Sequence, residues 1–297
     1  MLRTSSSSLL RRSLSSNLTG TLPAATPLTT PIFGALKLSQ AAPDVLRISL
    51  NRPEKSNALS MSAIDELSEA FSFVNDSPSI RAVLLNGEGK HFCAGIDLED
   101  FGVLLHSVHD PSDIFGDAST RARSLVKVIR TLQNNISSPS RCRVPVICAT
   151  HGESLGAGMA LLSFTDIRIG TAGGGLQVTE PHLGFACDLG TLQRLPKLVS
   201  SASWTNEMCL SARRVSNEEA FEKGFFSSIF PTKEAAEAAA LNVAVRIAKL
   251  EPSAVEETKK SLQHTYAGVS EATGLEFIAL TNAAALQGRK IGKRSQK

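Results

Sequence analysis

The sequence predicts an α/β protein with one large core and a helical C-terminal region. Strand-like and helix-like segments alternate between residues 44 and 232, as in parallel sheets covered by helices. Two of the predicted strands end in turns of small residues. From residue 233 onward the strand signals stop, and the spacing of apolar residues is helical.

Residues 1–43 differ in composition from the rest of the chain. They are rich in serine, carry Arg3, Arg11 and Arg12, and contain no acidic residue. This composition is typical of a mitochondrial-type transit peptide, although a disordered N-terminus has a similar composition. We predict that residues 1–43 are a transit peptide or a disordered segment outside the fold, and that the protein is located in the mitochondrial matrix.

The remainder of the chain is close to neutral. The formal net charge is +3, and the four positive charges before Asp44 leave −1 for the rest. A near-neutral body gives no electrostatic reason to expect a nucleic-acid partner, and no apolar run approaches the length of a membrane span. The five cysteines form no C-x-x-C pair, so we expect free thiols in a reducing compartment and no metal site.

The elements of the core are predicted from the period of their apolar residues and from their boundary residues. Ser60 or Ser62 is the expected N-cap of the first helix, and residues 233–297 form the helical C-terminal region. The core elements are a strand at 45–50, a helix at 60–74, a strand and turn within 81–98, a helix at 117–136, and a strand–turn–helix–strand unit within 144–171.

Two short runs of small residues follow predicted strands: "FCAGIDL" (92–98) and "HGESLGAGMAL" (151–161). Small side chains let a ligand approach the backbone, and free N–H groups at a helix start favour negative charge. Two such turns side by side would supply two donors to one oxygen, which is an oxyanion hole. Alternatively, the glycines only allow close packing. The second run has neither the dinucleotide-binding spacing nor the P-loop spacing.

Glu180 and Asp188 lie among apolar and small residues in the run "GLQVTEPHLGFACDLGTLQRLP". In a purely structural role, Asp188 would cap the helix that begins near Leu189, and Glu180 would lie on a solvated loop. In a catalytic role, they would form a general acid/base pair, one group ionised and one protonated. A position near a helix start would lower the pKa of Asp188, although burial would oppose this.

Five motifs in this order resemble one known family: "NRPEKSNAL", "GKHFCAGIDL", "HGESLGAG", "DIRIG" and "DLGTLQRLPK". From about residue 44 to 290 the chain is identified as a member of the crotonase (enoyl-CoA hydratase/isomerase) superfamily. It is most similar to the Δ3,5-Δ2,4-dienoyl-CoA isomerases. The resemblance implies a crotonase-type spiral of repeated β-β-α turns over residues 44–232, followed by a C-terminal helical region over 233–297.

The resemblance also assigns residues. It places the family's oxyanion donors at the backbone N–H groups of Ile96 and Ala157, and its paired catalytic carboxylates at Glu180 and Asp188. The oxyanion and substrate-binding set that it implies is Ala94, Gly95, Ile96, Asp97, Leu98 and Ala157.

The implied reaction converts 3,5-dienoyl-CoA to 2,4-dienoyl-CoA by proton transfer, a step of fatty acid β-oxidation. The acyl-CoA thioester is the expected substrate. CoA is part of that substrate, so no further cofactor and no metal are implied. The family also implies self-association into trimers or hexamers.

Ala160 departs from the family pattern, which has a third acid at this position, Asp in the dienoyl isomerases and Glu in the hydratases. A hydratase needs two glutamates around one water, so Ala160 argues against hydration. We expect Glu153 to be a surface group and His151 to be a hydrogen-bonded histidine at a strand end. The alternative functions are a Δ3-Δ2-enoyl-CoA isomerase that uses one carboxylate, and a CoA-binding homologue without catalysis.

Overall fold

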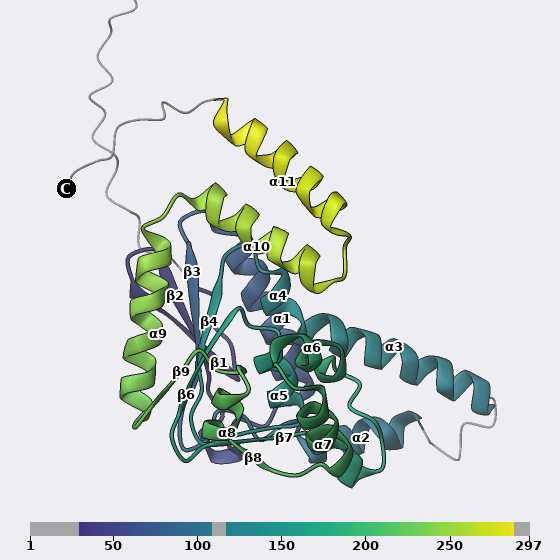
Figure 1. Cartoon of the computed structure of the whole chain (residues 1–297). Coiled ribbons are helices and arrows are strands. Elements are labelled where there is room, and N and C mark those ends of the chain that lie inside the picture. Colours follow the sequence, from purple (N-terminus) through teal and green to yellow (C-terminus); the bar gives the residue numbers. More distant parts are fainter. Residues whose placement is uncertain (1–29, 109–116, 288–297) are drawn as a thin grey trace, which may run out of the picture.

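The computed structural model describes residues 30–108 and 117–287, and its α/β architecture agrees with the prediction (Figure 1). A six-stranded sheet has the order β1-β2-β3-β4-β6-β9, and a second sheet has the order β5-β7-β8. The strands are β1 (Leu36–Ala42), β2 (Val45–Leu50), β3 (Ala82–Gly87), β4 (Val146–Ala149), β5 (Glu153–Leu155), β6 (Ile167–Thr171), β7 (Gly175–Gln177), β8 (Val215–Ser216) and β9 (Ser228–Phe230).

Helices surround the two sheets and connect most of their strands (Figure 1). Two of them, η1 and η2, are short 3-10 helices. The helices are η1 (Pro53–Lys55), α1 (Met61–Asp76), α2 (Leu98–Val108), α3 (Ala118–Ile136), α4 (Ser138–Arg141), α5 (Ala157–Ser163), η2 (Glu180–Leu183), α6 (Thr191–Leu198), α7 (Ala202–Ser211), α8 (Asn217–Glu222), α9 (Lys233–Ala248), α10 (Pro252–Tyr266) and α11 (Glu271–Leu286).

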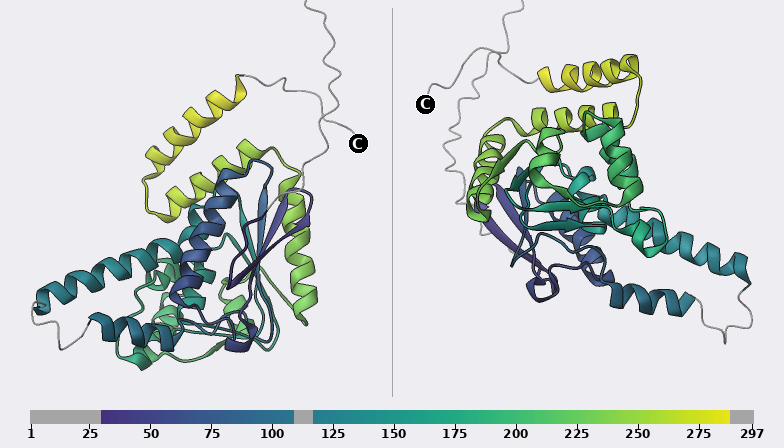
Figure 2. Two further views of the ribbon diagram at one scale, coloured as in Figure 1. Left: turned by 180° about the vertical axis from the view of Figure 1, so that it is seen from behind. Right: turned by 60° about the horizontal axis from the view of Figure 1, so that its bottom comes forward.

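The large sheet is buried on both faces, which explains the strongly apolar strands (Figure 2). One face packs on α9 through a column of small residues at four-residue spacing: Ala236, Ala240, Ala244 and Ala248. The other face packs on α1, with Ile64, Leu67 and Phe71 in the contact. α9 therefore belongs to the core, although it comes from the helical C-terminal region.

The predicted lower boundary of the fold, after residue 43, is wrong. β1 pairs antiparallel with β2, with Leu36 opposite Leu50, and Leu36 is buried. We did not predict β1 because it is a half-exposed edge strand whose serine and alanine content continues that of the preceding segment. Residues 1–29, which hold the arginines of the predicted transit peptide, lie outside the described residues.

Two predicted helices have well-defined starts. Ser60, rather than Ser62, caps α1, because its Oγ accepts a hydrogen bond from the Ala63 N–H at 3.1 Å. Asp117 caps α3 in the same way, by accepting from the Thr120 N–H. α2 and α3 project together from one side of the core (Figures 1 and 2). Within the described ranges, no helix is both long enough and apolar enough to cross a membrane.

Candidate active site

The two turns of small residues lie side by side. The Cys93 N–H donates to the Glu153 oxygen at 3.1 Å, and the Leu155 N–H donates to the Cys93 oxygen at 2.9 Å. Gly95 has a φ of 99°, and a Cβ on it would lie 3.0 Å from the Leu155 oxygen and 3.8 Å from the Ala157 nitrogen. Glycine is therefore needed at residue 95 both for its conformation and for the close approach of the second turn.

Each turn presents one free amide. Ala157 is the first residue of α5, so no intrahelical bond uses its N–H. Among the described residues the Ile96 N–H donates no hydrogen bond either. The positive φ values of the second turn, 57° and 47°, fall on Gly152 and Gly156 and not on Ala157, so alanine is unstrained at this position. Two free amides side by side suit an oxyanion hole, although that role stays a prediction.

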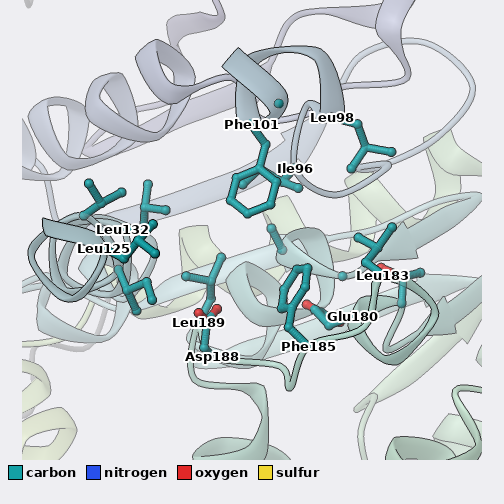
Figure 3. A pocket seen from close by; sticks show the side chains of 16 residues that line it. Ile96, Leu98, Phe101, Leu125, Leu132, Glu180, Leu183, Phe185, Asp188 and Leu189 are labelled. Carbon is teal, nitrogen blue, oxygen red and sulfur yellow. The ribbon is translucent and has the colours of Figure 1, made fainter. Parts of the chain in front are cut away.

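A cavity of about 490 Å³ opens beside these turns (Figure 3). Its volume is typical of a small-molecule site. The walls are apolar apart from Thr179, Glu180 and Asp188. The lining residues are Ile96, Leu98, Phe101, Gly102, Leu125, Val128, Ile129, Leu132, Gly156, Ala157, Thr179, Glu180, Leu183, Phe185, Asp188 and Leu189.

Glu180 begins η2 and is 6% exposed, so its suggested place on a solvated loop is wrong. Its Oε1 lies 3.5 Å from the position of a Cβ on Gly156, which places the carboxyl against the turn that presents the Ala157 amide. Its Oε2 is sealed from solvent and accepts no hydrogen bond from the described part of the chain. Burying an unpaired polar group costs free energy, which favours a functional reason for this acid.

Asp188 is half-buried in the wall of the same cavity. It does not cap α6, because Gly190 is the N-cap residue and α6 has no side-chain cap. Two opposing effects on the pKa of Asp188 were expected, and burial prevails, since it raises the pKa of this carboxyl. The Gln133 Nε2 donates to the Asp188 backbone oxygen at 2.7 Å, which ties this segment to α3.

Ala94 and Asp97 do not line the cavity, so their placement does not support the predicted role in substrate binding. The Ala94 N–H donates to the Ser56 oxygen, and the Asp97 carboxylate accepts from the Arg52 guanidinium at 3.0 Å. Burial alone would raise the pKa of Asp97, but the hydrogen bond and charge of Arg52, together with hydrogen bonds from the backbone at Glu99 and Asp100, lower it overall. Leu98 does line the cavity and is 58% exposed at its edge.

The other candidate groups near the second turn do not line the cavity. Ala160 is fully buried on α5. We expected Glu153 to be a surface group. Its carboxylate instead forms an ion pair with the Arg214 guanidinium at 2.6 Å. His151 is buried, its Nε2 lies 2.9 Å from the Gly89 oxygen, and burial lowers its pKa. Among residues 30–108 and 117–287, no group of three or more His, Cys, Asp or Glu side chains could hold a metal ion.

The apolar wall of the cavity was not predicted from the sequence. Leu125, Val128, Ile129 and Leu132 form one stripe on α3, and Phe101 of α2 faces Phe185 with ring centroids 6.0 Å apart. These four α3 residues have i, i+3, i+4, i+7 spacing on an otherwise polar helix, and this spacing could have identified them from the sequence. It predicts an apolar face, but not whether that face contacts the core or a cavity.

Comparisons with known proteins agree with this architecture. The family model for enoyl-CoA hydratase/isomerase matches residues 40–284. A human protein named Delta(3,5)-Delta(2,4)-dienoyl-CoA isomerase, mitochondrial, is 36% identical over 268 residues, covering 89% of this chain and 79% of that protein. The peroxisomal protein of that name from Arabidopsis thaliana is 36% identical over 242 residues, covering 82% and 85%.

Solved structures show the same fold. An enoyl-CoA hydratase from Bacillus anthracis superposes with a TM-score of 0.73 at 28% identity, covering 84% of this chain and 90% of that one. A Thermobifida fusca structure in complex with acetoacetyl-CoA has a TM-score of 0.70 at 28% identity, covering 85% and 94%. This chain is therefore an isomerase that belongs to the enoyl-CoA hydratase/isomerase family.

Proposed function

We propose that the protein converts 3,5-dienoyl-CoA to 2,4-dienoyl-CoA in fatty acid β-oxidation. The observation that carries this proposal is the placement of two carboxyls, Glu180 and Asp188, in an otherwise apolar cavity beside two free amides. The names of the human and Arabidopsis thaliana relatives support the reaction. The acetoacetyl-CoA in the Thermobifida fusca complex supports an acyl-CoA thioester as the substrate class.

In the proposed mechanism, the Ile96 and Ala157 amides donate to the thioester oxygen and stabilise the charge that develops on it. One carboxyl removes a proton from C2. The C3–C4 and C5–C6 double bonds then shift to C2–C3 and C4–C5, and the other carboxyl delivers a proton to C6. Glu180 and Asp188 share these two transfers. The reaction moves protons only, so we propose that it needs no metal or redox cofactor.

The direct test is to mix the purified protein with 3,5-dienoyl-CoA and to follow the absorbance of the diene conjugated with the thioester. We expect this absorbance to rise with enzyme concentration. A protein that binds the substrate but leaves the spectrum unchanged would contradict the proposal. A protein that acts only on 3-enoyl-CoA would instead be the one-carboxylate isomerase.

We also propose that the protein assembles into trimers or hexamers. α11 packs on α10 but buries none of its own residues fully, and Leu275, Leu280 and Leu286 remain exposed. An apolar helix that projects from the body, as in Figures 1 and 2, favours a contact with another copy.

The proposed location is the mitochondrial matrix. The acid-free segment that carries Arg3, Arg11 and Arg12 supports it, as do the names of the mitochondrial relatives, although one plant relative is named peroxisomal. A fluorescent protein carrying residues 1–35 should enter mitochondria. Replacing the three arginines with glutamate should prevent import. Peroxisomal fluorescence of the full chain would contradict the proposal.

A further inference from the structure

A second cavity lies at the opposite end of the large sheet from the active site. It has a volume of about 570 Å³, and α10 forms one of its walls. The active-site turns follow the carboxyl ends of β3 and β4, whereas this cavity is lined by Pro145 and Ile167, at the amino ends of β4 and β6. The two cavities share no lining residue. A volume of this size is typical of a small-molecule site.

The walls of the second cavity are largely apolar. Leu250 and Leu262 are 57% and 51% exposed, so the apolar wall continues to the surface of the protein. A hydrocarbon chain lying along this wall would be removed from water, which is favourable. The larger apolar residues of the wall are Ile167, Leu198, Ile247, Leu250, Val255 and Leu262.

Arg168 of β6 brings a buried positive charge to this cavity. The residue is 8% exposed, and its guanidinium donates from Nε to the Phe225 oxygen at 2.8 Å and from Nη1 to the Thr165 oxygen at 2.6 Å. Its Nη2 has no hydrogen-bond partner in the described part of the chain and, unlike Oε2 of Glu180, is not sealed from solvent. Because Arg168 lines the cavity, Nη2 is available there to donate to a ligand.

Arg194 of α6 brings a second guanidinium to the same cavity. Its Nε donates to the Ser163 oxygen at 3.3 Å, and the guanidinium lies over the Tyr266 ring, 5.7 Å from the centroid. Among residues 30–108 and 117–287, no carboxylate lies within ion-pair distance of either Arg168 or Arg194. Both positive charges therefore lack an anionic partner within the part of the chain that the structure describes.

The other charged groups that line the cavity do not cancel these two charges. Lys259 and Asp166 form an ion pair at 2.7 Å and offset each other. Glu251 is exposed as the N-cap residue of α10. Burial lowers the pKa of the Arg168 guanidinium to about 10 and also lowers the pKa of Arg194, but arginine stays protonated at neutral pH. The cavity thus combines apolar walls with a net positive charge.

We propose that this cavity binds an aliphatic carboxylate, the chemical class to which fatty acids belong. The carboxylate accepts from Nη2 of Arg168 and from the guanidinium of Arg194, and the hydrocarbon chain lies along the apolar wall toward Leu250 and Leu262. Guanidinium and carboxylate groups match in geometry, and their charge-assisted hydrogen bonds are strong. Because Arg168 is almost completely buried, the occupant must be narrow, which favours a hydrocarbon chain over a helix of another protein.

Tyr266 provides a local probe, because the chain contains one tyrosine and it lines this cavity. The full chain labelled with 3-fluorotyrosine should give one resonance in fluorine NMR. Decanoate, kept below the concentration at which it forms micelles, should shift this resonance to saturation. Decanol has the same chain without the charge and should bind at least about tenfold more weakly, the cost of losing a charge-assisted hydrogen bond. Acetate, which has the charge without the chain, should cause no shift.

The absence of a saturable shift with decanoate would overturn the inference, and so would equal affinities for decanoate and decanol. A resonance that moves when the protein is diluted, but not when decanoate is added, would place a second copy of the chain in the cavity and would also overturn it. None of these measurements requires turnover, so they are independent of the proposed isomerase activity.

Variants test where the carboxylate binds. Arg194→Gln should weaken decanoate binding about tenfold or more and leave decanol binding unchanged. Leu262→Glu places a negative charge at an exposed position of the wall and should also weaken decanoate binding, which keeps the test decisive if Arg194→Gln does not fold. Arg130→Gln removes an exposed arginine of α3 outside the cavity and is the matched control. If folded Arg194→Gln or Leu262→Glu binds decanoate as tightly as the control, the inference is wrong.

Discussion

At the scale of single residues, Glu180 and Asp188 share a cavity but differ in their surroundings. Glu180 is almost completely buried against the Gly156 turn, with one oxygen sealed behind the wall. Asp188 is half-buried and lies beside Leu189 near α3 (Figure 3). Two carboxyls in unequal environments suit a reaction that removes one proton and delivers another several carbons away.

Conservative substitutions separate catalysis from structure at these two positions. Glu180→Gln and Asp188→Asn keep shape and volume, and each should lower kcat by about 10²–10⁴-fold if it transfers a proton in the transition state. Acyl-CoA affinity should change little, because the proposed oxyanion donors are backbone groups. Steady-state kinetics and calorimetric titration with a saturated acyl-CoA check both expectations. If Asp188→Asn turns over normally, the protein is a one-carboxylate isomerase.

The stability of Asp188→Asn should depend on pH. Burial raises the pKa of Asp188 in the folded state, so the native protein loses stability as the pH rises through that pKa. Asparagine removes this loss. The variant should therefore melt at or slightly above the wild-type temperature at neutral pH, and the difference should fade toward about pH 4. A variant that melts clearly lower at neutral pH would indicate a structural role that the geometry does not show.

Ala160 predicts poor hydration of 2-enoyl-CoA. Because Ala160 has no carboxyl and does not line the cavity, it cannot help to hold a water molecule. Hydration should be at least about 10²-fold slower than diene isomerisation, because losing one positioned acid or base slows a reaction by at least about this factor. The two reactions can be compared in one assay series. Comparable rates would mean that another group, such as Glu153, holds the water.

At the scale of elements, the site depends on the contact between two turns that are far apart in the sequence. Cys93 pairs with β5, and Gly158 on α5 packs directly against Cys93. Because Ile96 and Ala157 follow closely in these two turns, any shift between the turns changes the distance between the two amides.

Gly158→Ala tests this contact. A Cβ on Gly158 would lie 2.7 Å from the Cys93 Cβ and 2.8 Å from its backbone oxygen, so the turns must move apart. Overpacking of this kind costs about 1–3 kcal/mol, and kcat should fall together with the melting temperature. Gly274→Ala on α11 meets no atom within 4 Å and serves as the control. An active Gly158→Ala enzyme of normal stability would show that the spacing of the turns is not critical.

The sequence predicted local elements better than the contacts between them. The strand at 45–50 and the helix that begins after Ser60 follow from apolar periodicity and a capping residue, which are local signals. The placement of Asp97 was not predictable in this way. Its motif position suggested substrate contact, whereas its partner Arg52 lies 45 residues away and turns it toward the start of α2. The pKa of Asp188 likewise depends on burial by segments distant in the sequence.

At the scale of the whole molecule, the three C-terminal helices have different surroundings. α9 buries its alanine column against the large sheet. α10 is anchored by Lys259, whose Nζ donates to two backbone oxygens and pairs with Asp166 at 2.7 Å. Among the described residues, α10 is the only substantial neighbour of α11, which projects from the body (Figure 2). Folding of the core therefore leaves the apolar residues of α11 available for another copy.

Charged substitutions on α11 should prevent assembly without unfolding the core. Leu275 and Leu280 are 60% and 63% exposed, so glutamate at both positions creates no buried charge within one chain. In an interface, the same charges would be desolvated and unpaired, which is strongly unfavourable. Leu275→Glu combined with Leu280→Glu should shift the mass measured by sedimentation from an oligomer to a monomer, with the α/β circular dichroism retained. Leu210→Glu on α7, which changes an exposed leucine far from α11, is the matched control. If the double variant keeps the wild-type mass, α11 does not form the interface, and its apolar residues must serve another contact.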